Sequence, residues 1–189
     1  MYNLERVLGI LSGLTIGVAQ ITYLSNTVSK KITPSVLSWF GWACLMGTSL
    51  FSQIISHGWQ WSMTGVACST AGCLAISGTA WSSGNFAFRR GDLWFVAAGL
   101  VCVLVYIGSD SAWITTVFAV IADLLLGIPT FRKAYVSPAT ERSAAWMLGV
   151  VSSTFALLAC VHHDLIFVLF PGYLLLFNGG MVWLTRTRQ

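Results

Sequence analysis

Residues 111–133 of the chain have the sequence SAWITTVFAVIADLLLGIPTFRK. The first part, Ser111–Ile128, is apolar over a length close to the roughly 20 residues that cross the hydrocarbon core of a bilayer. A single acidic residue, Asp123, interrupts this run, and Pro129 and two basic residues follow it. The pattern predicts a transmembrane helix that carries one ionisable group and ends beside cations.

The composition of the whole chain agrees with this prediction. Of its 189 residues, 56% are hydrophobic and 8% are charged, whereas soluble domains carry about 25% charged residues. Such a chain is not expected to be a water-soluble enzyme, and no nucleophile with its base or phosphate-binding loop suggests an enzyme of another kind. The basic residues form no stripe, so nucleic acid is not an expected partner. The expected partner is the lipid bilayer, and no cofactor is implied.

Apolar runs between charged or turn-forming residues predict seven transmembrane helices. The connections between them are short, so we expect an all-α membrane protein with a single transmembrane domain over residues 1–189. The predicted helices are Val7–Ser25, Ser35–Ser56, Ser62–Trp81, Leu93–Gly108, Ser111–Ile128, Ala144–Val161 and Leu165–Leu184.

The basic residues predict the orientation, because lysine and arginine in short loops stay on the cytoplasmic side. Seven helices place nine of the ten basic residues on one side and only Arg6 on the other. We therefore expect a multi-pass protein of a plasma membrane, such as a bacterial inner membrane, with an external N-terminus and a cytoplasmic C-terminus. The nine cations are Lys30, Lys31, Arg89, Arg90, Arg132, Lys133, Arg142, Arg186 and Arg188.

Two parts of the chain, residues 1–88 and 110–189, match each other at an offset of about 103 residues. The order of uncommon residue types agrees, which chance similarity between apolar helices does not readily produce. We predict two parallel three-helix repeats, joined by a linker helix within residues 89–109. The matched pairs are Ala19-Gln20 with Ala122-Asp123, Thr27 with Thr130, Lys30 with Lys133, Pro34 with Pro138, Ser38 with Ser143, Trp39 with Trp146, and His57 with His162.

This three-plus-one-plus-three arrangement resembles the SWEET and PQ-loop superfamily, which includes vitamin-transporter relatives. The segment from Asp123 to Lys133 is similar to the PQ-loop pattern, since a proline near the end of the fifth helix precedes a basic loop. Position 26 is Asn where that family usually has a proline. The resemblance implies a SWEET-like fold and transport of a small solute. It also implies that Asn178, on the seventh helix, contacts the substrate.

Asp123 is the acidic residue placed well inside a predicted span. It lies roughly 9 Å along the helix from Pro129 at 1.5 Å per residue, where an ionised carboxylate costs about 2.5–3.5 kcal/mol. One interpretation is that it binds a proton, a cation or a hydrogen-bonding solute. The other is that it is held by neighbouring polar groups and only stabilises the bundle. Gln20 is its counterpart in the first helix.

Further candidate residues are aromatic, or lie where a helix could bend. Trp39, Trp42 and Trp146 could stack on a solute ring or belong to an interfacial belt. Asn178 could line a cavity or bond a neighbouring helix. Pro129 and the pair Gly179-Gly180 are predicted hinges, the latter in a segment that could unwind.

His57, His162 and His163 are expected at the outer ends of helices, where solvation is favoured over a metal site.

The sequence thus favours a small secondary transporter or facilitator that moves a small polar solute, such as a sugar, vitamin or amino acid, by alternating access. Proton coupling through Asp123 and uniport are both compatible with it. The alternative is a non-transporting membrane receptor or scaffold with the same fold. The glycines Gly9, Gly13 and Gly17 form a small-residue face that predicts close helix packing. The chain is expected to be a monomer or a small homo-oligomer.

Overall fold

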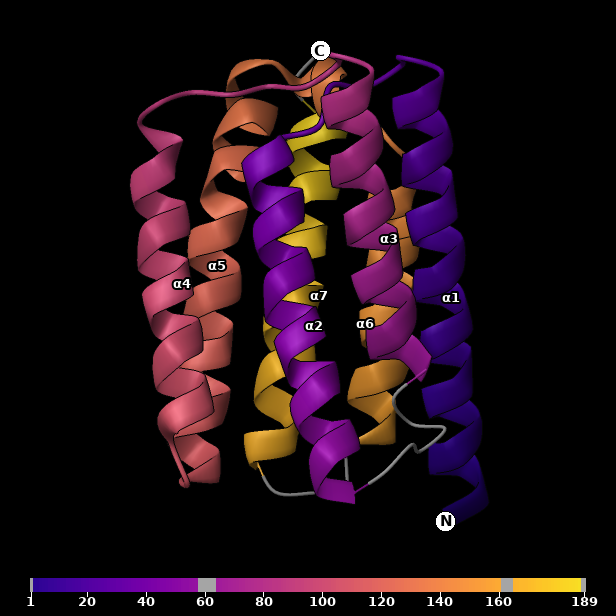
Figure 1. Cartoon of the computed structure of the whole chain (residues 1–189). Coiled ribbons are helices and arrows are strands. Elements are labelled where there is room, and N and C mark those ends of the chain that lie inside the picture. The colour runs from indigo at the N-terminus through magenta and orange to yellow at the C-terminus, as the bar shows by residue number, and fades with distance from the viewer. Residues whose placement is uncertain (1, 58–63, 161–164, 188–189) are drawn as a thin grey trace.

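The computed structural model describes residues 2–57, 64–160 and 165–187, and within these residues the chain is a helical bundle (Figure 1). The predicted all-α fold class is confirmed. A short 3₁₀ helix, η2 (Pro138–Glu141), separates α5 and α6. The α-helices are α1 (Tyr2–Val28), α2 (Val36–His57), α3 (Thr64–Ser82), α4 (Asp92–Gly108), α5 (Ala112–Val136), α6 (Ala145–Ala159) and α7 (Leu165–Thr187).

Three segments of the described helices are long and apolar enough to cross a membrane: Leu4–Val28, Trp113–Val136 and Leu165–Thr187. Shorter apolar segments lie in α2, α4 and α6. Large apolar side chains also point outward, and Trp94 and Leu176 are 80% and 77% exposed. Apolar surface on this scale has no favourable contact with water. These features are compatible with a membrane protein.

The helices pack as a ring with one helix outside it. Following the contacts around the ring gives the order α1, α3, α2, α5, α7, α6 and back to α1. The remaining helix, α4, packs against α5 and, less extensively, α2, and it lies at the edge of the bundle in Figure 1. The space inside the ring is therefore bounded by the helices of both predicted repeats.

Two predicted helix features need correction. The fifth helix does not end at Ile128, because α5 continues through Pro129 to Val136. A proline removes one backbone donor and crowds the carbonyl group four residues before it, but the buried Thr130 and Ala134 keep the following turn packed. The segment around Gly179-Gly180 is not unwound either, because α7 is helical through it.

The loops that carry most of the cations gather at one end of the bundle. In Figure 1 the C-terminus lies at this end, together with the connections α1–α2, α3–α4 and α5–α6, while the N-terminus lies at the opposite end. We call these the basic end and the N-terminal end. Lys30, Lys31, Arg89, Arg90 and Arg142 lie in these three connections, and Arg188 is outside the described residues.

The glycine face of α1 packs less closely than predicted. A Cβ atom on Gly13 would lie 3.6 Å from the backbone of Gly65, so α1 and α3 approach closely at this point. A Cβ atom on Gly9 or Gly17 would meet nothing within 4 Å. Both of these glycines line a cavity, because this face of α1 runs along the space inside the ring.

Candidate functional site

A cavity of about 1020 Å³ lies in the bundle and also reaches outward-facing residues of α1, among them Leu14, Val18 and Ile21. Its described lining residues come from all six helices of the ring, and none comes from α4. Along α1 it runs from Glu5, near the N-terminal end, to Tyr23, which is roughly 27 Å at 1.5 Å per residue. The volume is sufficient for a small organic solute.

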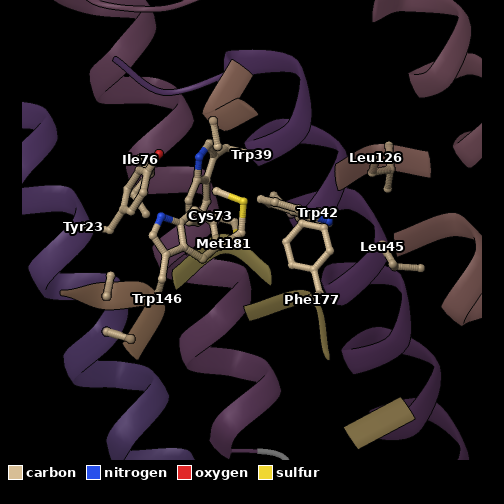
Figure 2. Packing of buried hydrophobic residues seen from close by; sticks show 14 of the residues in the cluster. Tyr23, Trp39, Trp42, Leu45, Cys73, Ile76, Leu126, Trp146, Phe177 and Met181 are labelled. Carbon is tan, nitrogen blue, oxygen red and sulfur yellow. The ribbon is translucent and has the colours of Figure 1, made fainter. Parts of the chain in front are cut away.

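Five aromatic side chains form the deep end of this cavity, and we call them the aromatic layer: Tyr23, Trp39, Trp42, Trp146 and Phe177. Figure 2 shows Tyr23, Trp39 and Trp146 grouped on one side and Trp42 facing Phe177 on the other. The ring centroids of Tyr23 and Trp39 are 4.3 Å apart, and those of Trp42 and Phe177 are 5.8 Å apart. The layer joins side chains from α1, α2, α6 and α7.

Two of the indole groups in the aromatic layer are held by backbone acceptors. Trp42 Nε1 donates to the carbonyl oxygen of Asp123 at 3.2 Å, and Trp146 Nε1 donates to that of Glu141 at 3.0 Å. Trp39, Trp42 and Trp146 are only 5–6% exposed. They therefore do not form a belt at the surface of the bundle, and their proposed contact with a solute stays a prediction.

Asp123 lines the cavity beside the aromatic layer. Its side chain is 3% exposed, and Oδ2 accepts a hydrogen bond of 2.8 Å from the hydroxyl group of Tyr173. A buried carboxylate without such a donor would be strongly disfavoured. The residue thus has features of both interpretations, since a neighbouring side chain holds it and it also borders the cavity.

Gln20, the predicted counterpart of Asp123, borders the same cavity. Its Nε2 atom lies 3.8 Å from Cys73 Sγ, and its buried Oε1 has no hydrogen-bond donor among the described residues. Gly72 permits this position, because a Cβ there would lie 2.6 Å from the Gln20 side chain. Asp123 also interacts electrostatically with Cys73. The two counterparts therefore both lie near the same α3 residue.

Asn178 also lines the cavity. Its Nδ2 donates to the carbonyl oxygen of Leu174 at 2.8 Å, within α7. Its Oδ1 lies against Gly149 of α6, where a Cβ atom would come within 2.3 Å. The glycine thus provides the space that this amide occupies. A substrate contact for Asn178 remains a prediction.

The three predicted hinge residues lie within continuous helices. Pro129 is inside α5, and Gly179 and Gly180 are inside α7. Gly180 has a packing role, because a Cβ there would lie 2.9 Å from the ring of Phe131. No second conformation is described here, so hinge motion stays a prediction for all three.

Beyond the aromatic layer, four residues form a buried polar group that we call the Glu141 cluster: Tyr23, Thr33, Lys133 and Glu141. Glu141 is 0% exposed; one carboxylate oxygen lies 2.6 Å from Lys133 Nζ, and the other accepts a 2.6 Å hydrogen bond from the Tyr23 hydroxyl. Lys133 also donates to the carbonyl oxygen of Thr33. The cluster connects α1, the α1–α2 loop, α5 and η2.

Hydrogen bonds between loops surround the Glu141 cluster. The backbone N–H of Thr33 donates to the carbonyl oxygen of Thr140 at 2.9 Å, and that of Ala87 donates to Pro34 at 2.8 Å. Asn85 Nδ2 donates to the carbonyl oxygen of Ile32 at 2.9 Å. These bonds join the three connections of the basic end, and no residue of these connections is among the described lining residues of the cavity.

Burial raises the pKa of Glu141 above its ordinary value. The positive charge of Lys133 and the hydrogen bonds from Lys133 and Tyr23 act in the opposite direction and only partly offset burial. A proton therefore binds Glu141 more tightly when the basic end is closed than it would if the side chain were in water.

Sequence reasoning missed Glu141, Tyr23 and Tyr173. It singled out Asp123 as the one charge inside, whereas Glu141 and Asp92 are also buried, at 0% and 6% exposure. An acidic residue in a short polar loop is ordinarily solvated, so Glu141 gave no signal. For Tyr23 a signal was available, because it lies three positions after Gln20 and therefore on the same helix face.

Metal ligands do not gather in the part of the chain that the structure describes: no three His, Cys, Asp or Glu side chains come close enough to hold an ion. His162 and His163 lie outside the described residues, and His57 is the last residue of α2. No protein-family model, curated protein or solved structure matches this chain, so the resemblance to the SWEET and PQ-loop superfamily stays a prediction.

Proposed function

We propose that the chain is a multi-pass membrane protein that moves a small polar solute by alternating access. In this proposal it is a small secondary transporter or facilitator rather than an enzyme. The observation that carries the proposal is that the two ends of the bundle differ: one leads into a cavity and the other is closed. A cavity of about 1020 Å³ extends from the N-terminal end to the aromatic layer, and the Glu141 cluster closes the basic end behind that layer.

Seven membrane-spanning helices are part of this proposal. Three long apolar segments and the outward apolar side chains support it, and the positions of the basic loops support a cytoplasmic basic end. The N-terminal end would then face outward. The structure corresponds in this view to an outward-facing state, in which the solute reaches the aromatic layer from outside.

The order of helices around the ring supports the proposed repeat. If α1, α2 and α3 exchange places with α5, α6 and α7, respectively, the order of helices around the ring is unchanged. Two parallel three-helix units related by a two-fold axis would give this order, with α4 as the linker. This agrees with the proposed SWEET-like and PQ-loop-like fold, in which two units rock about a central site.

The test is solute counterflow in proteoliposomes that contain the purified full chain. We expect uptake of at least one small polar solute from a panel of sugars, amino acids, vitamins and organic cations. Asp123→Asn and Asn178→Ala should reduce uptake, whereas Asp110→Asn, at an exposed position between α4 and α5, should not. Uptake that no lining substitution affects would contradict a route through this cavity.

The second candidate is a receptor or scaffold that binds a ligand in the same cavity without transport. The continuous course of α5 through Pro129 and of α7 through Gly179 favours it, because neither helix is broken beside the cavity. Binding of a solute without any counterflow of that solute would support this candidate and refute transport. A change in a gradient-driven uptake with external pH would distinguish proton coupling from uniport.

A further inference from the structure

We propose that the deep end of the cavity binds an organic monocation, such as a quaternary ammonium group. This inference rests on the proposed function for the route by which the solute arrives, and it names the chemical class of the solute. Three features of the site support it: the charge of the lining, the aromatic layer, and the small number of free hydrogen-bonding groups.

The charge-bearing lining residue at depth is an acid. The charged residues among the described lining residues are Glu5, Arg6 and Asp123. Glu5 and Arg6 lie in the first turns of α1, so they border the cavity near the N-terminal end. Asp123 is then the charged lining group beside the aromatic layer, within the described residues. A carboxylate in such a low-dielectric site attracts a cation more strongly than it would in water.

The aromatic layer suits a cation that is weakly hydrated. A cation over the face of a Trp, Tyr or Phe ring is attracted by the ring's quadrupole, and several rings around one site form the cage that binds quaternary ammonium groups. Trp42 and Trp146 have their N–H groups bound to backbone oxygens, so neither N–H group is free for a solute. Trp39 Nε1 has no hydrogen-bond partner among the described residues. Trp42 also donates to the backbone of Asp123, which places the carboxyl-bearing residue at the layer.

The hydrogen-bonding groups around the cavity are mostly used within the protein. Ser12 and Ser152 bond each other at 3.1 Å, Ser153 donates to the Gly149 carbonyl oxygen at 2.8 Å, and Asn178 Nδ2 donates to Leu174. A sugar needs a partner for each of several hydroxyl groups, and an unpaired buried hydroxyl is costly. A quaternary ammonium group needs none. Gln20 Oε1 and Trp39 Nε1 are the buried lining atoms without a partner among the described residues, and two such groups are fewer than a sugar needs, so this lining fits a cation better.

The test compares cations with neutral molecules of the same shape on the unmodified full chain in detergent. The pairs are choline with 3,3-dimethylbutan-1-ol, and N-methylpyridinium with toluene. Isothermal titration should give at least about tenfold tighter binding for each cation, which corresponds to about 1.4 kcal/mol. Equal binding within both pairs, or no binding of either cation, would overturn the inference without any substitution having to fold.

Substitutions then locate the site. Asp123→Asn should weaken choline binding by about tenfold or more, and Asp123→Glu, which keeps the charge, should retain most of it. Asp92→Asn is the matched control, because Asp92 is also a buried acid but belongs to α4, outside the cavity lining. An equal effect of Asp92→Asn and Asp123→Asn would refute the assignment to Asp123.

The inference and the proposed transport fail separately. If choline binds but shows no counterflow in proteoliposomes, the cation site stands and transport fails. If a neutral sugar shows counterflow while neither cation binds, transport stands and the cation site is refuted.

Discussion

The two ends of the bundle are held together in different ways. At the basic end, side chains and loops from distant parts of the sequence form a polar network around the buried Glu141. Toward the N-terminal end, Glu5 and Arg6 border the described cavity, and beyond them its wall along α1 consists mainly of small and apolar residues, among them Gly9, Gly13 and Gly17. The hydrogen bonds of a network are cooperative, so they can form and break together. Small side chains, in contrast, leave space between the helices.

This difference indicates which end is built to stay closed in the conformation described. The Glu141 cluster uses an ion pair whose separation would leave a buried carboxylate and a partly buried ammonium group without partners. The aromatic layer lies between this cluster and the cavity, and Tyr23 belongs to both. Tyr23 therefore links the aromatic layer to the cluster, and the following predictions test that relation.

The largest expected effect comes from Glu141→Ala, because this substitution removes the centre of the polar network that distinguishes the basic end from the N-terminal end. The substitution leaves Lys133 partly buried without its partner and removes the acceptor for Tyr23, so we expect a loss of roughly 3–5 kcal/mol of stability. Thermal unfolding in detergent, followed by size-exclusion chromatography, measures it. The exposed Asp110→Ala should leave the transition unchanged, and similar curves for the two variants would show that the cluster does not hold the basic end.

Tyr23→Phe tests the link between the aromatic layer and the cluster. It keeps the ring but removes the hydroxyl that donates to Glu141 at 2.6 Å, and a hydrogen bond to a charged group contributes about 1.5–3 kcal/mol. We expect a smaller loss of thermal stability than for Glu141→Ala. In a double-mutant cycle with Glu141→Ala, which removes the acceptor, the two losses should not add; additive losses would mean that the bond is not made.

A pair of glycine substitutions tests the packing of the cavity wall. Gly149→Ala places a Cβ atom 2.3 Å from Asn178 Oδ1, so overpacking should cost about 1–3 kcal/mol and should weaken solute binding. Gly78→Ala meets nothing within 4 Å and should stabilise α3 by about 0.5–1 kcal/mol through helix propensity. Thermal shifts of the same sign for both variants would contradict this account.

The smallest expected effect is a pH dependence of closure at the basic end. Because burial raises the pKa of Glu141 in the closed arrangement, protonation favours closure. Closure should be complete at acidic pH and weaken as pH rises through the raised pKa. Modification of Ser143→Cys by a soluble maleimide, measured relative to that of an Asp110→Cys variant at an exposed position, should therefore increase with pH. The ratio removes the general rise in thiolate with pH, and both values are corrected for the five native cysteines. The trend should vanish with Glu141→Gln, and a trend of the opposite sign would disprove it.

Whether a structural feature could be predicted depends on whether it is set by the local sequence or by contacts with distant segments. The helices could be predicted because an apolar run of sufficient length has few other stable conformations. Asp123 and Trp146 could be singled out because a carboxyl group or a repeated Trp is uncommon in such a run. Glu141 could not, since its burial results from Lys133, Tyr23 and Trp146, which lie on other segments.

The sequence by itself determined the all-α fold class, the approximate position of each helix and the presence of an acidic residue within an apolar segment, because these depend on local composition and periodicity. Only the tertiary structure decided which helices border the cavity, that Trp39 and Trp146 lie together in one aromatic layer, and that Glu141 closes one end. These features arise from packing between segments more than 100 residues apart, such as Tyr23 and Glu141. No local pattern encodes such a contact, because its free energy appears only when the whole ring of helices has assembled.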